Sequence, residues 1–375
     1  MQLIVAIIIV IIVYVLQHEV YKRIWNKSLD VDISFDDACI EVGETGGITE
    51  VINNAKLLPL SVLHVKFSAD RSFDFIEHKN STVTDCYYRN DAFSVMGNER
   101  ITRHLKFIAS KRGFYEIGKV NIITRDFFLT GNIASSLKQN SFMYVLPEKL
   151  YSEQLYIMLN KIHGELINRR SLLEDPYTFR GLREYDVTDT IRKINWKASA
   201  KSENLMVNMY DHTSEAKVCI LLNLETNIML KPETLRETAI KMTAAITEYF
   251  IKHGIPVMVE SNGTDCISGK CDSVTYGASG EHALTIYKYL ARIKENTGIE
   301  AYIELVNKKV KNPDKNITYF FVTPYYKEDL LLKLDYLYSN GLDVHAVVPY
   351  YDIQKFDIYK PYIHGWEVRM NENGN

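Results

Sequence analysis

The period of the hydrophobic pattern changes along this chain, and that change constrains its architecture. Between residues 28 and 150, apolar and polar residues alternate in short runs, for example at 31–35 and 101–109. Alternation with period two is typical of strands that bury one face, and turn residues such as Gly46 and Gly47 separate the runs. The sequence therefore predicts a β-sandwich over residues 28–150.

The C-terminal half shows a different pattern. Residues 217–224 form a continuous apolar run, which is typical of a buried parallel strand. After Pro232, apolar residues recur at three- and four-residue steps, as in an amphipathic helix. Further strands are expected at 255–260, 317–323 and 344–348, and further helices at 279–294 and 327–340. Because strands and helices alternate, we predict an α/β doubly wound domain with a mostly parallel sheet over residues 212–375.

The N-terminus carries an unbroken apolar run at residues 3–16. Fourteen helical residues rise about 21 Å, so a membrane span of roughly 30 Å requires the helix to extend over residues 1–21. A cleaved signal peptide would need basic residues before the run and a small-residue cleavage site after it, and the sequence has neither. A buried core helix is the other alternative. We expect an uncleaved transmembrane anchor over residues 1–25.

The basic residues Lys22, Arg23 and Lys27 follow the apolar run. Since basic residues favour the cytoplasmic side, this order predicts a single-pass protein of the cell membrane with most of the chain in the cytoplasm. The lipid bilayer is then a partner, contacted through residues 1–21.

Composition limits the other classes of partner. A chain of 375 residues has room for two domains, and its formal net charge of −3 argues against nucleic acid as a partner. The five cysteines are odd in number and widely spaced, which predicts free thiols in a reducing compartment. Cys266 and Cys271 lack the second pair of ligands that a zinc site needs. We expect no cofactor and no metal.

The segment 180–201 is both strongly charged and aromatic. It reads Gly-x-Arg-x-Tyr, then Asp-x-x-Arg-x-Ile-Asn-Trp, then Ser-Ala-Lys. The candidate signature and interaction residues are Gly181, Arg183, Tyr185, Asp189, Arg192, Asn195, Trp196 and Ser199. A second motif has basic residues before Gly113 and an Asp126-aromatic stretch after it, and there we expect structural roles. Together these motifs resemble the bacterial and archaeal domain of unknown function 58 family.

The resemblance implies a domain organisation and a function. It implies a linking helix and signature segment at residues 151–211, and a von Willebrand factor A-like domain at 212–375. Family members look like companions of MoxR-type AAA+ ATPases and of other membrane proteins. The function implied is that of a membrane-anchored, non-catalytic adaptor or scaffold for protein–protein interaction.

The signature segment itself allows two interpretations. In the structural one, Arg183 and Arg192 pair with Asp186 and Asp189, while Tyr185, Ile194 and Trp196 bury apolar surface where the domains meet. In the alternative, the protein is a hydrolase in which Asp186 or Asp189 is a general base and the two arginines bind an anion. The segment contains no histidine.

Domains of the von Willebrand factor A type often bind a divalent cation through Asp-x-Ser-x-Ser at the end of their first strand. This chain has Asn223, Glu225 and Thr226 there, so the Asp and both Ser are absent. We expect this degenerate loop to hold no metal. It still lies at the carboxyl end of a strand, where open α/β sheets usually bind ligands.

Overall fold

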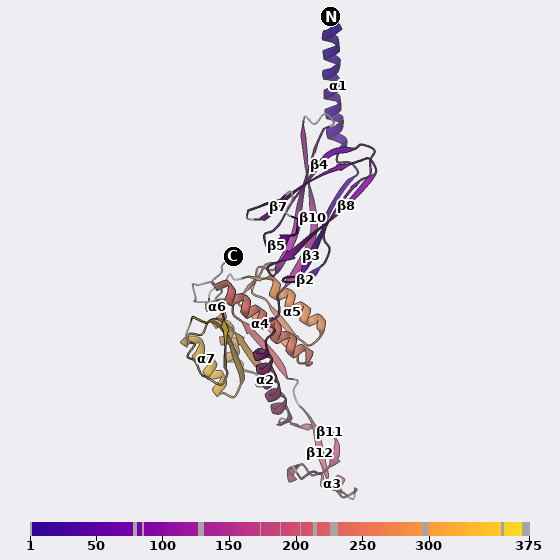
Figure 1. Cartoon of the computed structure of the whole chain (residues 1–375). Helices are drawn as coiled ribbons and strands as arrows, with labels where there is room; N and C mark the ends of the chain where they lie inside the picture. Colours follow the sequence, from indigo (N-terminus) through magenta and orange to yellow (C-terminus); the bar gives the residue numbers. More distant parts are fainter. Residues whose placement is uncertain are drawn as a thin grey trace. The chain divides into compact units, whose positions relative to one another are not determined.

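The computed structural model describes residues 2–77, 81–84, 86–126, 131–172, 174–187, 189–202, 204–212, 216–225, 232–294, 299–353 and 356–369. The chain divides into two compact units, Met1–Glu148 and Lys149–Asn375 (Figure 1).

The first unit is a sandwich of two sheets that follow one helix, α1 (Gln2–Ile24). One sheet has the order β1-β3-β8-β5 and the other β2-β10-β9-β4-β7-β6. The strands are β1 (Leu29–Phe35), β2 (Cys39–Glu41), β3 (Thr45–Asn54), β4 (Leu60–Asp70), β5 (Phe73–Phe75), β6 (Ser81–Val83), β7 (Cys86–Val95), β8 (Glu99–Ala109), β9 (Gly113–Arg125) and β10 (Asn132–Leu146).

The alternating sequence pattern determines which side chains enter the sandwich core. In the antiparallel pair β1–β3, Val31 lies opposite Ile52 and Ile33 lies opposite the carboxyl residue Glu50, and all four are buried. The aromatic rings of Phe73 and Phe107 pack in the same core with centroids 4.4 Å apart. The sandwich-like domain expected from the sequence is therefore present.

The second motif of the sequence has the structural roles that we expected. A Cβ atom on Gly113 would lie 2.7 Å from the ring of Tyr115, so the glycine allows a close approach. Asp126 is fully buried, and its Oδ1 accepts a hydrogen bond of 3.2 Å from the backbone N–H of Gly131. The aromatic residues after Asp126, at 127–129, lie outside the described residues.

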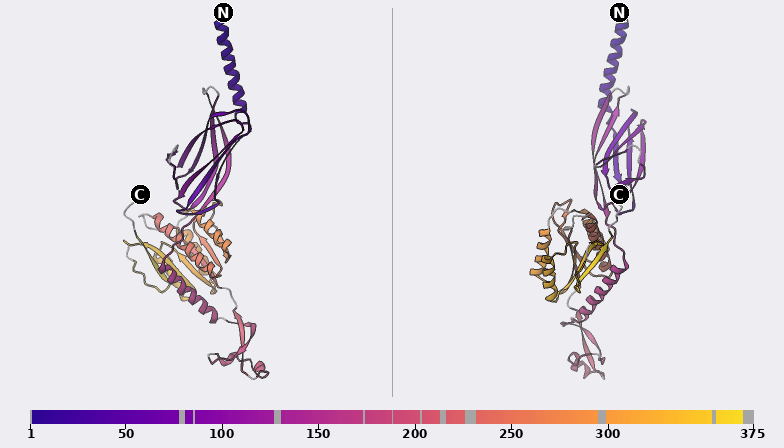
Figure 2. Two further views of the ribbon diagram at one scale, coloured as in Figure 1. Left: turned by 45° about the vertical axis from the view of Figure 1, so that its right-hand side comes forward. Right: turned by 60° about the vertical axis from the view of Figure 1, so that its left-hand side comes forward.

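Helix α1 is held to the sandwich by its last turns. Tyr21 and Trp25 are buried in the sandwich core, and the Tyr21 hydroxyl lies 3.5 Å from Oγ1 of Thr124. His18 contacts Asp126. Figure 2 shows the helix leaving one end of this unit.

The prediction of a single-pass membrane anchor is wrong. None of the helices found among the described residues is both long and apolar enough to cross a membrane. The anchor required residues 17–21 to extend the apolar run, but the structure packs His18 and Tyr21 against the sandwich instead. The cell-membrane localisation depended on that extension and is corrected with it, whereas a bilayer contact through residues 1–21 stays a prediction.

The second unit contains a six-stranded sheet of order β16-β14-β13-β18-β19-β20 (Figure 1). Its strands are β13 (Lys217–Leu222), β14 (Val257–Ser261), β16 (Ser273–Gly277), β18 (Ile317–Val322), β19 (Asp343–Tyr351) and β20 (Ile363–Val368). Two small sheets accompany it, formed by β11 (Glu174–Glu184) with β12 (Met206–His212) and by β15 (Thr264–Asp265) with β17 (Ile293–Lys294).

The helices of this unit are α2 (Glu153–Leu172), α3 (Trp196–Ser199), α4 (Pro232–Lys252), α5 (Gly280–Arg292), α6 (Ile299–Lys311) and α7 (Glu328–Ser339), with a 3-10 turn η1 at Ile191–Lys193. Pro232 opens α4, where its missing N–H costs no helical hydrogen bond. Ser279 caps α5 by accepting from the N–H of His282, and Gly341 follows α7 with φ +77°.

The predicted fold class is wrong in its membrane anchor and in its C-terminal domain, although the N-terminal sandwich is present. The described residues show no membrane anchor and no doubly wound von Willebrand factor A-like fold. The sheet of the second unit is mixed, because β16 runs antiparallel to β14 at its edge. The sequence did not indicate this reversal, since residues 262–278 carry neither a long apolar run nor a helical period.

Candidate functional site

The signature segment forms a separate hairpin in the second unit. Strands β11 and β12 pair antiparallel, with Arg183 opposite Val207 and Glu184 opposite Met206. The segment between the strands carries η1 and α3 and folds back so that Ile194 bridges to Val207. Ile194 and Val207 are buried and form a small core of their own. We call the described residues of 174–212 the signature hairpin.

An arginine clamp holds the first part of the connecting segment. Arg183 donates from Nη1 to Oδ2 of Asp189 at 2.6 Å and from Nη2 to Oδ1 at 2.5 Å. The same carboxylate accepts the backbone N–H of Asp186 at 3.0 Å. The Arg183 hydrogen bonds, followed by that of Asp186, lower the pKa of Asp189. The contact predicted between Arg183 and Asp189 is confirmed.

Two other signature residues attach helix α3 to β12. The Asn195 side chain caps α3 by accepting from the N–H of Ala198 at 2.9 Å, and its amide donates to Oδ1 of Asn208 at 2.7 Å. The Ser199 hydroxyl donates to the carbonyl of Asn195 at 2.9 Å and accepts from the N–H of Met206 at 2.8 Å. The fold of the hairpin therefore uses both residues.

Trp196 and Arg192 have no comparable role in the fold. Trp196 begins α3 with 65 % of its surface exposed, although we expected it to be a buried wedge. That expectation is wrong because Ile194, two residues earlier, fills the small core instead. Arg192 is exposed and makes no hydrogen bond or ion pair within the described part of the chain, so the predicted pairing with Asp186 or Asp189 does not form. Tyr185 is half-buried, and its N–H donates to the carbonyl of Leu205.

No close contact explains why position 181 holds a glycine. A Cβ atom at this position would meet Cε of Met209 at 3.9 Å, an ordinary contact.

The degenerate loop after β13 is a closed hydrogen-bond network. Oδ1 of the buried Asn223 accepts from the N–H of Glu225 at 2.9 Å and from the Asn262 amide at 2.8 Å. Its amide nitrogen donates to Oγ1 of Thr323 at 2.9 Å and to the carbonyl of Glu225 at 3.1 Å. Thr226 lies outside the described residues. Both polar atoms of the Asn223 side chain therefore bind protein groups, and its oxygen already accepts two hydrogen bonds from the protein.

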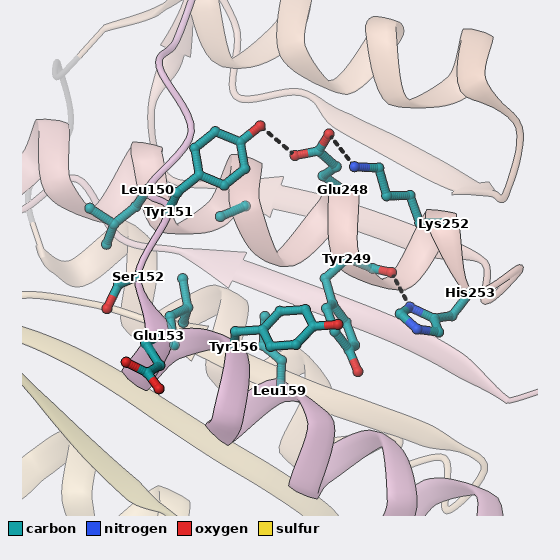
Figure 3. A pocket seen from close by; sticks show the side chains of 12 residues that line it. Leu150, Tyr151, Ser152, Glu153, Tyr156, Leu159, Glu248, Tyr249, Lys252 and His253 are labelled. Carbon is teal, nitrogen blue, oxygen red and sulfur yellow. Dashed lines mark hydrogen bonds and ion pairs between the residues drawn. The ribbon is translucent and has the colours of Figure 1, made fainter.

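A cavity of about 590 Å³ lies between the start of α2 and the C-terminal half of α4 (Figure 3). Tyr151 and Tyr156 lie on one side, and Glu248, Tyr249 and Lys252 on the other. No motif in the sequence marks this site. A signal that could have found it is the pair of tyrosines at 151 and 156, together with Tyr249 on the helix expected after Pro232.

Comparison with known proteins supports the family resemblance over part of the chain. Residues 181–312 match the family model described as "Protein of unknown function DUF58". No curated protein matches the chain.

Solved structures with some likeness to this chain cover about a third of it. The CARDB domain of a Pyrococcus furiosus protein is 11% identical, covers 31% of this chain and 90% of its own, and has a TM-score of 0.20. A type II cohesin domain from the cellulosome of Acetivibrio cellulolyticus is 11% identical, covers 32% and 95%, and has a TM-score of 0.23. A non-cellulosomal cohesin from Archaeoglobus fulgidus is 14% identical, covers 34% and 97%, and has a TM-score of 0.22. These likenesses are too weak to inform function.

Proposed function

We propose that the protein is a non-catalytic adaptor or scaffold that binds a partner protein through the end of its signature hairpin. The binding surface consists of Val187, Ile191, Arg192, Trp196 and Lys197, which we call the tip surface. The family resemblance suggests a MoxR-type AAA+ ATPase as the partner.

One observation carries this proposal: the signature divides into residues that the hairpin needs and residues that it does not need. Arg183 and Asp189 hold the connecting segment. Trp196 and Arg192 instead expose a large aromatic ring and a guanidinium. Exposed apolar groups beside cations are typical of protein-binding surfaces, where Trp and Arg are the most frequent energetic anchors.

The chemistry of the tip surface defines the kind of partner. Val187 and Ile191 are also strongly exposed, and residues 187–201 carry four cations and one acid. A complementary surface would offer an apolar pocket for Trp196 with carboxylates around it. Because dissolved ions screen charge pairs at the edge of an interface, binding should weaken as the salt concentration rises.

The alternative, a hydrolase that uses Asp186 or Asp189 with Arg183 and Arg192, has less support. Both oxygens of Asp189 already accept hydrogen bonds from Arg183, and these lower its pKa. A carboxylate with a lowered pKa is a poor proton acceptor near neutral pH. Turnover by the purified chain without a partner, lost on Asp189→Asn, would favour the hydrolase.

A site-specific cross-link tests the adaptor proposal. A photoreactive amino acid is placed at position 196, and in a control at position 336, because Tyr336 is similarly exposed on α7 of the same unit. With the purified MoxR-type ATPase of the same organism, position 196 should cross-link and position 336 should not. Equal or absent cross-linking at 196 would contradict the proposal.

A further inference from the structure

We infer that the cavity between α2 and α4 is a binding site for a small, uncharged aromatic molecule with an N–H donor. The site lies outside the signature hairpin and is independent of the adaptor proposal. Its volume, about 590 Å³, falls within the range of pockets that hold small ligands.

The floor of the cavity is apolar and fixed. Leu155 and Leu159 of α2 and Ala245 of α4 line it, and all three are buried. Tyr249 also lines the cavity, and it is fixed because its hydroxyl donates to Oδ1 of Asn160 at 2.6 Å. A ligand therefore meets a preformed surface and does not have to order it.

Two tyrosine rings give the cavity a preference for aromatic ligands. Tyr156 and Tyr249 come from different helices and meet edge to face, with centroids 5.7 Å apart and an interplanar angle of 78° (Figure 3). A third ring placed in this corner can pack edge to face or offset against both, the geometries that aromatic rings prefer. An aliphatic ligand would gain only from apolar burial.

The charges on the Glu248 side of the cavity are paired with one another. Glu248 is neutralised by Lys252, with Nζ at 3.0 Å from Oε1, and by Lys149 at 3.8 Å. Its other oxygen accepts from the Tyr151 hydroxyl at 3.2 Å. On this side a cationic ligand would meet Lys252, and an anionic ligand would have to compete with Glu248 for that lysine.

Hydrogen-bonding groups remain at the edge. Among the described residues, the Ser152 hydroxyl, the Glu153 carboxylate and the Tyr156 hydroxyl have no side-chain partner, and all three line the cavity. A carboxylate accepts hydrogen bonds and cannot donate them. The complementary ligand thus carries an N–H donor on its ring, as indole does.

Methyl NMR of the full chain tests this site directly. Indole, tetramethylammonium and benzoate are titrated separately into protein labelled at alanine and leucine methyl groups. Indole should shift the methyl signals of Leu155, Leu159 and Ala245 through its ring current, with a Kd on the order of 1 mM for so small a fragment. Tetramethylammonium and benzoate should bind at least tenfold more weakly than indole.

Two variants decide whether the shifts come from this cavity. Ala245→Phe fills the floor and should abolish the indole shifts. Tyr156→Ala removes one wall of the corner and should weaken binding roughly three- to tenfold. Tyr336→Ala is the matched control, because the two tyrosines are 56% and 57% exposed on helices of the same unit. Absence of indole shifts, shifts that Tyr156→Ala leaves unchanged, or equal binding of all three probes would overturn the inference.

Discussion

The imidazole Nδ1 of His18 lies 3.1 Å from Oδ2 of Asp126, a carboxylate with no exposed surface. The two residues join the last turns of α1 to the far end of strand β9. This contact, with Tyr21 and Trp25 buried beside it, makes the end of α1 part of the sandwich.

Removing this carboxylate should loosen the end of α1. Asp126→Ala deletes the contact with His18 and leaves the Gly131 N–H without its acceptor, so we expect a loss of about 1–3 kcal/mol in the free energy of unfolding. Asp74→Ala, at an exposed position of the same unit, should change little. The check is chemical denaturation, together with hydrogen exchange at Tyr21 and Trp25. Unchanged exchange there would show that the contact does not hold the helix.

The buried Glu50 should make the sandwich less stable at high pH. Burial, with a further contribution from Asp91, raises the pKa of Glu50 to about 7. An unfolded glutamate loses its proton near pH 4.5, so the folded state is progressively penalised between about pH 4.5 and 7. Glu50→Gln should therefore be more stable than the wild type at pH 8, by up to roughly 3 kcal/mol, and similar below pH 4.

Denaturation curves across this pH range check the Glu50 prediction. Glu116→Gln, at an exposed position on β9, is the control and should follow the wild type. A constant stability difference from pH 4 to 8 would mean that Glu50 titrates normally.

Within the signature hairpin, stability should depend on Ile194 and not on Trp196. Ile194 is 9% exposed and contacts Val207, so Ile194→Ala should cost about 2 kcal/mol, at the low end for a core residue because this core is small. Trp196→Ala should stay within about 0.5 kcal/mol of the wild type. Hydrogen exchange of the β11 and β12 amides measures both, since the hairpin can open locally. A large effect of Trp196→Ala would restore the buried-wedge interpretation.

The loop after β13 should depend on its own hydrogen bonds and not on a metal. Asn223→Ala breaks four hydrogen bonds of a buried amide, and we expect a cost of about 1–3 kcal/mol. Asn312→Ala, at an exposed position, is the control. Millimolar Mg²⁺ should leave the Tm unchanged, because a ligand far below its Kd adds almost nothing to stability. A rise in Tm with Mg²⁺ that Glu225→Ala abolishes would contradict this.

The sequence predicted elements well where a local pattern decides the outcome. Alternation places Val31 and Ile33 in the sandwich core because a strand's side chains alternate between its faces. Ser279 and Pro232 mark helix starts because capping and the missing N–H act within one turn.

The sequence failed where the partner of a residue lies far away in the chain. From the sequence, Tyr21 is expected at the end of an apolar helix, and only the fold places Thr124 beside it. Trp196 and Ile194 both offer apolar surface, and only the bridge to Val207 decides which of them is buried. The Tyr156–Tyr249 corner likewise needs two helices to meet. In these cases tertiary contact, and not local preference, determines burial.

The affinity between the purified full chain and the MoxR-type ATPase tests the central claim most directly. The proposal predicts binding to the wild type and to Tyr336→Ala, and at least tenfold weaker binding to Trp196→Ala with Arg192→Ala, while all variants keep the stability of the wild type. Binding to the double variant as tight as to the wild type would show that the tip surface is not the docking site.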